Sequence, residues 1–225
     1  MSVKEQLLSI KKELEGTSAQ LIAVSKTKPN TLIEEAYSAG QRAFGENKVQ
    51  ELVDKAEALP KDIAWHMIGH LQRNKVKYIA PFVHLIHGVD TLKLLKEINK
   101  EGKKNNRIIS CLLQIHIAME DTKFGFSMDE VRELLDSGVL DELPNISIVG
   151  LMGMATHTPD ETLIRNEFAG LRTFFEALQT SYTHSQLALE EISMGMSGDY
   201  KIAVGEGSTM VRIGSSIFGT RNYTV

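Results

Sequence analysis

The chain has 225 residues, of which 42% are hydrophobic, and carries 25 Lys and Arg against 29 Asp and Glu, a formal charge of −4. This balance gives no electrostatic argument for a nucleic-acid or acidic-membrane partner, and no apolar run approaches the length of a membrane span. One cysteine cannot form an internal disulfide, and the charged N-terminal stretch lacks a signal-peptide core. We therefore expect a cytoplasmic protein.

Helix and strand patterns alternate along the chain. The first apolar residues recur at helical spacing and predict an amphipathic helix from Val3 to about residue 16. Eight strands are expected after it, separated by helices. The strands are expected at residues 21–26, 42–47, 64–69, 83–89, 107–118, 146–155, 187–196 and 210–218.

Several helix starts carry capping signals, which sharpen the alternation. The expected signals are the capping boxes Thr31-x-x-Glu34 and Ser127-x-x-Glu130, an N-cap at Asp90, and the segment Thr158-Pro159-Asp160-Glu161. Eight strands alternating with helices predict a parallel sheet with helical crossovers. In this length, they favour an α/β fold of the closed (β/α)₈ TIM-barrel type, forming a single domain over residues 1–225 behind an N-terminal helix. An open doubly wound sheet is the alternative, because counting strands cannot prove closure.

Either architecture places the chemistry at the carboxyl ends of the strands. Lys26 lies there, on the same strand face as the apolar Ile22 and Val24. A desolvated lysine is costly unless it is paired, and with a lowered pKa it is a good nucleophile toward an aldehyde. The alternative is a lysine that only marks the strand end and extends to solvent.

Small and hydroxyl residues after the last two strands indicate an anion site. The segment from Gly195 to Asp199 and the pair Gly214-Ser215 let backbone amides approach a phosphate, and Ser197 and Ser215 add hydroxyl donors. Ordinary turn glycines would give a similar pattern. Arg212, in an apolar strand, needs a partner, which is either a ligand or an acid such as Glu206 or Glu190.

Four histidines, His66, His70, His84 and His87, raise the question of a metal site. They lie on or beside short strands, they form no helical His-x-x-x-His pair, and one cysteine offers no cluster. We therefore expect no metal.

Six ordered blocks spanning nearly the whole chain carry a family resemblance. They are AVSKTK at 23–28, FGENKVQE at 44–51, WHMIGHLQRNK at 65–75, GLMGMAT at 150–156, SMGMSGDY at 193–200 and GSTMVRIGSSIFG at 207–219. Together they resemble the YggS/PROSC family of pyridoxal 5′-phosphate (PLP) homeostasis proteins. The resemblance implies the barrel of the alanine racemase N-terminal type.

The resemblance also implies roles for individual residues. Lys26 would hold the PLP aldehyde as a Schiff base, and Arg212 would lie against the pyridine nitrogen. The phosphate would be bound by the segments that contain Met196, Ser197, Gly214 and Ser215. Asn47 and His66 would line the cofactor pocket, and Lys123 would approach the ring edge. A guanidinium keeps its protons, so the ring nitrogen would stay neutral and the ring would be a weaker electron sink.

Two classes of function follow from the resemblance. The first is a carrier that binds PLP and takes part in intracellular vitamin B6 homeostasis without turnover of its own. The second is a PLP-dependent amino-acid racemase, which needs an acid–base group on each face of the substrate. The sequence offers Lys26 and no evident second group, and no residues after Val225 remain for the second, β-rich domain of the racemases. We expect a monomeric carrier whose partners are PLP and PLP-dependent apo-enzymes.

Overall fold

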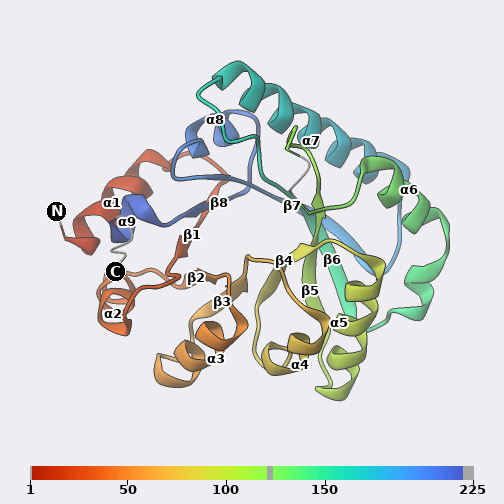
Figure 1. Ribbon diagram of the computed structural model, residues 1–225, viewed down its shortest axis with the longest axis horizontal. Coiled ribbons are helices and arrows are strands. Elements are labelled where there is room, and N and C mark those ends of the chain that lie inside the picture. The colour runs from red at the N-terminus through yellow and green to blue at the C-terminus, as the bar shows by residue number, and fades with distance from the viewer. Residues whose placement is uncertain (1, 121–123, 220–225) are drawn as a thin grey trace.

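Eight parallel strands form a closed barrel in which each strand pairs with the next and the last pairs with the first (Figure 1). The computed structural model describes residues 2–120 and 124–219. The expected closed barrel is confirmed, and the open sheet is wrong. The strands are β1 (Gln20–Val24), β2 (Ala43–Glu46), β3 (Ala64–Met67), β4 (Leu85–Val89), β5 (Ile109–Ile115), β6 (Ile146–Gly153), β7 (Leu187–Met196) and β8 (Met210–Ile213).

Helices surround the barrel and connect successive strands (Figure 1). They are α1 (Val3–Glu13), α2 (Asn30–Ser38), α3 (Val49–Ala58), α4 (Val76–Ile79), α5 (Leu92–Lys104), α6 (Met128–Asp136), α7 (Glu161–Ser181), α8 (Tyr200–Gly205) and α9 (Ser215–Phe218), with short 3₁₀ turns at Arg73–Lys75 and Val139–Glu142. The N-terminal helix α1 packs against α2 and α9, so it covers the junction between the first and last strands.

Apolar side chains fill two regions, as the alternation of a strand between its two faces requires. The larger core lies between the strands and the surrounding helices, where Phe44 packs against Trp65 with ring centroids 6.0 Å apart. The smaller core fills the barrel interior. Its buried members are Ile22, Ala43, Leu85, Leu112, Met152 and Met210. The barrel is therefore a packed core, and its polar site is confined to one end.

One expected capping box is confirmed, and three other helix starts differ from expectation. Ser127 and Glu130 form the expected capping box at the start of α6. The first turn of α2 contains Thr31, because the helix already begins at Asn30 after the extended Pro29. The N-cap of α5 is Thr91, since its hydroxyl accepts the Leu94 amide.

Asp90 instead lies 3.0 Å from the His70 ring nitrogen, which explains why it does not cap α5. Asp160 caps α7 by accepting the amides of Thr162 and Leu163, so the proline at position 159 lies outside the helix. The eighth strand is also shorter than expected. It ends at Ile213, and the Gly214 carbonyl accepts from Ile217 and Phe218 to start α9.

Candidate functional site

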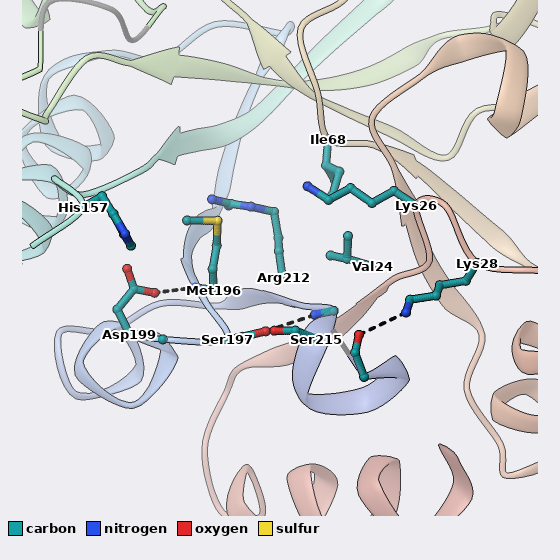
Figure 2. A pocket seen from close by; sticks show the side chains of 13 residues that line it. Val24, Lys26, Lys28, Ile68, His157, Met196, Ser197, Asp199, Arg212 and Ser215 are labelled. Atoms are coloured by element: carbon teal, nitrogen blue, oxygen red, sulfur yellow. Dashed lines mark hydrogen bonds between the residues drawn. The ribbon is translucent and has the colours of Figure 1, made fainter. Parts of the chain in front are cut away.

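A cavity of about 550 Å³ opens at the carboxyl ends of the strands (Figure 2). This volume lies within the range of about 300–1,000 Å³ that is typical of small-molecule sites. The structure brings together six of the eight residues expected in the site. These six are Lys26, Met196, Ser197, Arg212, Gly214 and Ser215. Lys26 is far from the other five in the sequence, and the pairing of β1 with β8 brings them together.

Lys26 lies two residues beyond the end of β1, which stops at Val24 and not at the lysine itself. Its side chain extends into the cavity beside Ile68, on the opposite side from His157 (Figure 2). The side chain is partly exposed, so solvent and small molecules can reach the amine. The lysine is therefore directed into the cavity and does not simply extend away from the barrel.

The loops after β7 and β8 form the opposite wall of the cavity. The Gly214 amide donates to the Ser197 hydroxyl across 3.3 Å, which links the two loops. The Met196 amide donates to the Asp199 carboxylate across 2.6 Å and tightens the first loop. Ser215 begins α9 and lines the same wall. This wall presents hydroxyls and backbone groups, which are the donors that bind phosphate.

Two glycines of this wall lie close to neighbouring elements. A Cβ on Gly214 would lie 3.1 Å from the Val24 carbonyl oxygen, so the end of β8 would have to shift slightly away from β1. A Cβ on Gly195 would lie 2.5 Å from the Cβ of Ala203, and the residue has a φ of +94°. The loop after β7 therefore follows a path, close under α8, that only glycine allows without strain.

Arg212 forms the inner end of the cavity and is buried in β8. One guanidinium nitrogen donates to the carbonyl and hydroxyl oxygens of Ser193 at 2.8 and 2.5 Å, and the other donates to the Gly153 carbonyl at 3.1 Å. Burial lowers the pKa of Arg212 to about 10, which leaves the side chain protonated near neutral pH. The expected alternative, an ion pair with Glu206, is not formed, because Glu206 pairs with Arg165.

A hydrogen-bonded chain runs from Arg212 into the barrel. Ser193 lies 2.9 Å from His87 Nδ1, and His87 Nε2 lies 2.9 Å from His66 Nδ1. The guanidinium can only donate, so the Ser193 hydroxyl accepts from it and donates its own proton to His87 Nδ1, which is the unprotonated ring nitrogen. His87 then donates to His66, and every proton in the chain points away from Arg212.

Both histidines are neutral because burial, more than the neighbouring positive charges, disfavours the imidazolium. The pKa of His66 is lowered to about 3, and the pKa of His87 is also well below its ordinary value. The expectation that His66 lines the cavity differs from its position. It lies three hydrogen bonds behind Arg212, and within the described residues its Nε2 atom has no hydrogen-bond partner.

Asn47 is also absent from the cavity lining among the described residues. It lies in the loop after β2, close to Gly69. A Cβ added to Gly69 would lie 2.6 Å from the backbone carbonyl oxygen of Asn47. The expected position of Lys123 lies outside the described residues. Sequence reasoning placed both Asn47 and His66 correctly near the carboxyl end of the barrel, but a strand of four residues leaves their depth undetermined.

Lys28 and His157 line the cavity although they were not among the expected site residues, and Asp199 belongs to the segment in which an anion site was expected. Lys28 Nζ donates to the carbonyls of Phe218 and Gly219 at 2.9 and 3.0 Å, so it ties the loop after β1 to the end of α9. His157 and Asp199 lie on the side of the cavity opposite Lys26, with the imidazole facing the carboxylate (Figure 2). The signal for His157 was present, because it follows β6 and the strand-end rule applies to that loop as well.

Within residues 2–120 and 124–219, no group of three or more His, Cys, Asp or Glu side chains is arranged to hold a metal ion. The helices in the same ranges include none with the length and apolar character needed to cross a membrane.

Comparison with known proteins agrees with this geometry. The family model described as "Alanine racemase, N-terminal domain" matches residues 2–222. A curated relative from Aquifex aeolicus, named pyridoxal phosphate homeostasis protein, is 41% identical over 91% of this chain and 88% of its own length. The chain therefore belongs to the alanine racemase N-terminal domain family, within its group of pyridoxal phosphate homeostasis proteins.

The solved structures of PipY from Synechococcus elongatus PCC7942 are similar over nearly the whole chain. The structure without PLP has a TM-score of 0.90 at 38% identity, and the structure with PLP bound has a TM-score of 0.85 at 37% identity. Each covers 97% of this chain and 100% of PipY. The barrel and its cavity are thus those of a family in which a PLP complex has been solved.

Proposed function

We propose that this protein binds PLP in the cavity as a Schiff base on Lys26 and takes part in the homeostasis of PLP in the cytoplasm. The observation that carries the proposal is the convergence of an amine, a guanidinium and a hydroxyl-rich wall on one cavity at the carboxyl end of the barrel. Membership of the pyridoxal phosphate homeostasis group and the PLP-bound structure of PipY support it.

The residues present fit the chemical features of PLP. Its aldehyde requires an amine, which Lys26 provides, and its phosphate requires neutral or positive donors. Ser197, Ser215 and the backbone at Gly214 supply such donors on the opposite wall. Val24 and Ile68 provide apolar surface for the ring between the two. Most of the interactions that would retain the cofactor are therefore available without movement of a strand.

Arg212 would bind the pyridine nitrogen as a donor that keeps its own proton. Its guanidinium is oriented by three hydrogen bonds to Ser193 and Gly153, so it faces the cavity without needing a carboxylate. Bound PLP supplies an electron sink to amino-acid chemistry, and a ring with a neutral nitrogen is a weaker sink. This arrangement suits a protein that stores and delivers the cofactor.

The alternative is an amino-acid racemase. One observation favours it, because His157 lies across the cavity from Lys26 and could act on the second face of a substrate (Figure 2). His157 is exposed, however, and its loop leaves it open to solvent. We expect no turnover of common amino acids in chiral chromatography. Turnover that is lost in both Lys26→Ala and His157→Ala would make the racemase the better account.

The proposal is tested by the absorbance spectrum of the pure protein with PLP, before and after borohydride. We expect a yellow chromophore that borohydride bleaches, and mass spectrometry should place the reduced adduct on Lys26. Lys26→Ala should abolish the adduct, whereas Lys12→Ala, which removes an exposed lysine from α1, should retain it. An adduct on Lys28, or none at all, would refute the assignment.

The proposal includes two statements about partners. The protein would act as a monomer and would deliver PLP to PLP-dependent apo-enzymes, which recognise the same aldehyde and phosphate. Light scattering of the loaded protein should give the mass of one chain. Transfer is tested by mixing the loaded protein with an apo-aminotransferase in the presence of a scavenger for free PLP. Recovery of activity no faster than from free PLP would contradict direct delivery.

A further inference from the structure

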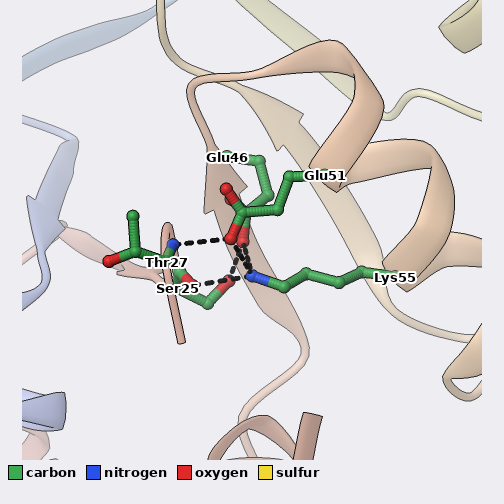
Figure 3. A network of polar contacts seen from close by, with 5 residues as sticks. All are labelled: Ser25, Thr27, Glu46, Glu51 and Lys55. Atoms are coloured by element: carbon green, nitrogen blue, oxygen red, sulfur yellow. Dashed lines mark hydrogen bonds and ion pairs between the residues drawn. The ribbon is translucent and has the colours of Figure 1, made fainter. Parts of the chain in front are cut away.

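A buried polar cluster lies behind the loop that carries Lys26 (Figure 3). Its members are Glu46 at the end of β2 and Glu51 and Lys55 on α3, and we call it the Lys55 cluster. The Lys55 ammonium lies 2.7 Å from a carboxylate oxygen of Glu46 and 2.7 Å from one of Glu51. The Lys55 and Glu46 side chains are only 6% and 0% exposed, so this ion pair is shielded from solvent.

The cluster binds the main chain on both sides of Lys26. Lys55 Nζ donates to the Ser25 carbonyl at 2.8 Å, and the Ser25 hydroxyl donates to Glu46 at 2.5 Å. On the other side, the Thr27 amide donates to Glu51 at 2.5 Å. The residue between these two anchors is Lys26, so its Cα is held from both directions.

The Thr27 anchor supports a backbone conformation that threonine rarely adopts. Its φ is +64°, in the left-handed region, which is unfavourable for a residue with a Cβ. The charge-assisted hydrogen bond from the Thr27 amide to Glu51 stabilises this conformation. Without it, the main chain after Lys26 would gain access to the ordinary extended and helical conformations, and the lysine would change direction.

The cost of removing the buried charges from water means that the cluster adds little to the stability of the fold. The Glu46 carboxylate and the Lys55 ammonium lose their hydration there, whereas Glu51 keeps part of its own; burial raises the pKa of Glu46, although Lys55 acts in the opposite direction. The Glu46 Oε2 atom has no hydrogen-bond partner in the described part of the chain. Buried ion pairs of this kind are often no more stabilising than apolar side chains of similar volume. Their value here lies in where they hold the main chain.

We propose that Glu51 and Lys55 are positioning residues that fix the main chain at Ser25 and Thr27 so that the Lys26 amine is aimed into the cavity. The inference rests on the proposed function, since it assumes that Lys26 condenses with the PLP aldehyde. It separates two tasks within the site. The wall after β7 and β8 binds the ring and phosphate, whereas the Lys55 cluster sets the reactivity of the amine.

The experiment compares an aldehyde with an analogue that cannot condense. Glu51→Ala removes the Thr27 anchor but keeps the pair between Lys55 and Glu46. Glu51→Gln keeps an oxygen acceptor, and Glu57→Ala removes an exposed carboxylate from the same helix as the matched control. The first readout is the rate at which PLP becomes fixed to Lys26 by borohydride, measured by mass spectrometry. The second is the affinity for pyridoxamine 5′-phosphate, which keeps the ring and phosphate but carries an amine.

We expect Glu51→Ala to slow adduct formation by about tenfold or more, since small misplacements of reacting groups cost up to about a hundredfold. Affinity for pyridoxamine 5′-phosphate should be unchanged. Glu51→Gln should recover much of the rate, and Glu57→Ala should match the unmodified protein. Adding Thr27→Gly to Glu51→Ala should restore part of the rate, because glycine adopts the left-handed conformation without cost.

Three results would overturn the inference. An unchanged adduct rate in Glu51→Ala, with the adduct still on Lys26, would refute the positioning role alone. Equal losses of adduct rate and pyridoxamine 5′-phosphate affinity, or failure of Glu51→Ala to fold, would show that the cluster is structural. Absence of any Lys26 adduct in the unmodified protein would refute the proposed function and, with it, this inference.

Discussion

Gly195→Ala is the substitution for which the structure gives the sharpest expectation. Gly195 is the penultimate residue of β7, just before the loop that lines the cavity opposite Lys26, and has a φ of +94°. An added Cβ would lie 2.5 Å from the Ala203 Cβ and 3.0 Å from the Tyr200 Cα, both on α8. The Tyr200 Cα belongs to the main chain, so no side-chain rotation relieves the contact, and α8 would have to shift away from β7.

The magnitude follows from three terms. A positive φ costs a residue with a Cβ about 1–2 kcal/mol. Overpacking of a filled interior costs about 1–3 kcal/mol. Alanine restricts the unfolded chain more than glycine does and returns about 0.4–1 kcal/mol. The net loss is therefore about 1–5 kcal/mol, a large part of the 5–15 kcal/mol that is typical of a folded protein.

Urea unfolding measures this loss by linear extrapolation. The matched control is Gly170→Ala in the middle of α7, where nothing lies within 4 Å of the added Cβ. Alanine favours a helix interior, so the control should gain about 0.5–1 kcal/mol. Gly195→Ala should also weaken PLP retention, because Met196 and Ser197 follow it directly. A loss below about 1 kcal/mol, or a gain like that expected of the control, would refute the steric reasoning.

Two other predictions concern the chain behind Arg212. Ser193→Ala removes an acceptor from Arg212 and the partner of His87 Nδ1, so the free energy of unfolding should fall by about 1–3 kcal/mol. Urea unfolding measures this loss, and Ser185→Ala, which removes an exposed hydroxyl, is the control that should leave the free energy unchanged. An equal effect of the two variants would contradict the chain. The folded-state pKa of His66 is about 3, so between pH 6.5 and 3 the unfolded chain binds more protons and stability falls as the pH falls. We expect His66 alone to cost about 2 kcal/mol between pH 7 and pH 5, and the pH slope to decrease in His66→Gln. A pH slope that is the same in His66→Gln as in the unmodified protein would contradict a neutral buried histidine at this position.

The barrel could be predicted because its signals are local. Each strand and helix has its own apolar period, and eight units in one chain favour closure. Helix caps were less predictable, since a polar side chain before a helix can bond either the first helical amides or a side chain from another loop. Asp90 had the right chemistry for an N-cap, but it contacts His70 from the neighbouring loop. Such a contact depends on how two loops meet, which the local sequence does not encode.

The lining of the cavity was predictable where position along a strand determines which residues meet. Lys26, Ser197 and Arg212 lie at or just beyond the ends of β1, β7 and β8, and the barrel brings those ends together. The depth of His66 could not be inferred, because it depends on the stagger of short strands around the barrel. The Lys55 cluster was missed for a related reason. Its residues become neighbours of Ser25 only when α3 packs against β2 and β3 and the Lys55 side chain reaches the end of β1.

The pairing of β1 with β8 is the seam at which the two ends of the described chain meet, and the cavity straddles it. Lys26 stands on one side of the seam, and Arg212 and Ser215 stand on the other. A ligand that contacts both sides binds the closed barrel better than a form in which β1 and β8 have separated, so by linkage it stabilises the closed barrel. Ligand binding would therefore require a completely folded barrel, because in a partly folded one Lys26 lies apart from Arg212 and Ser215.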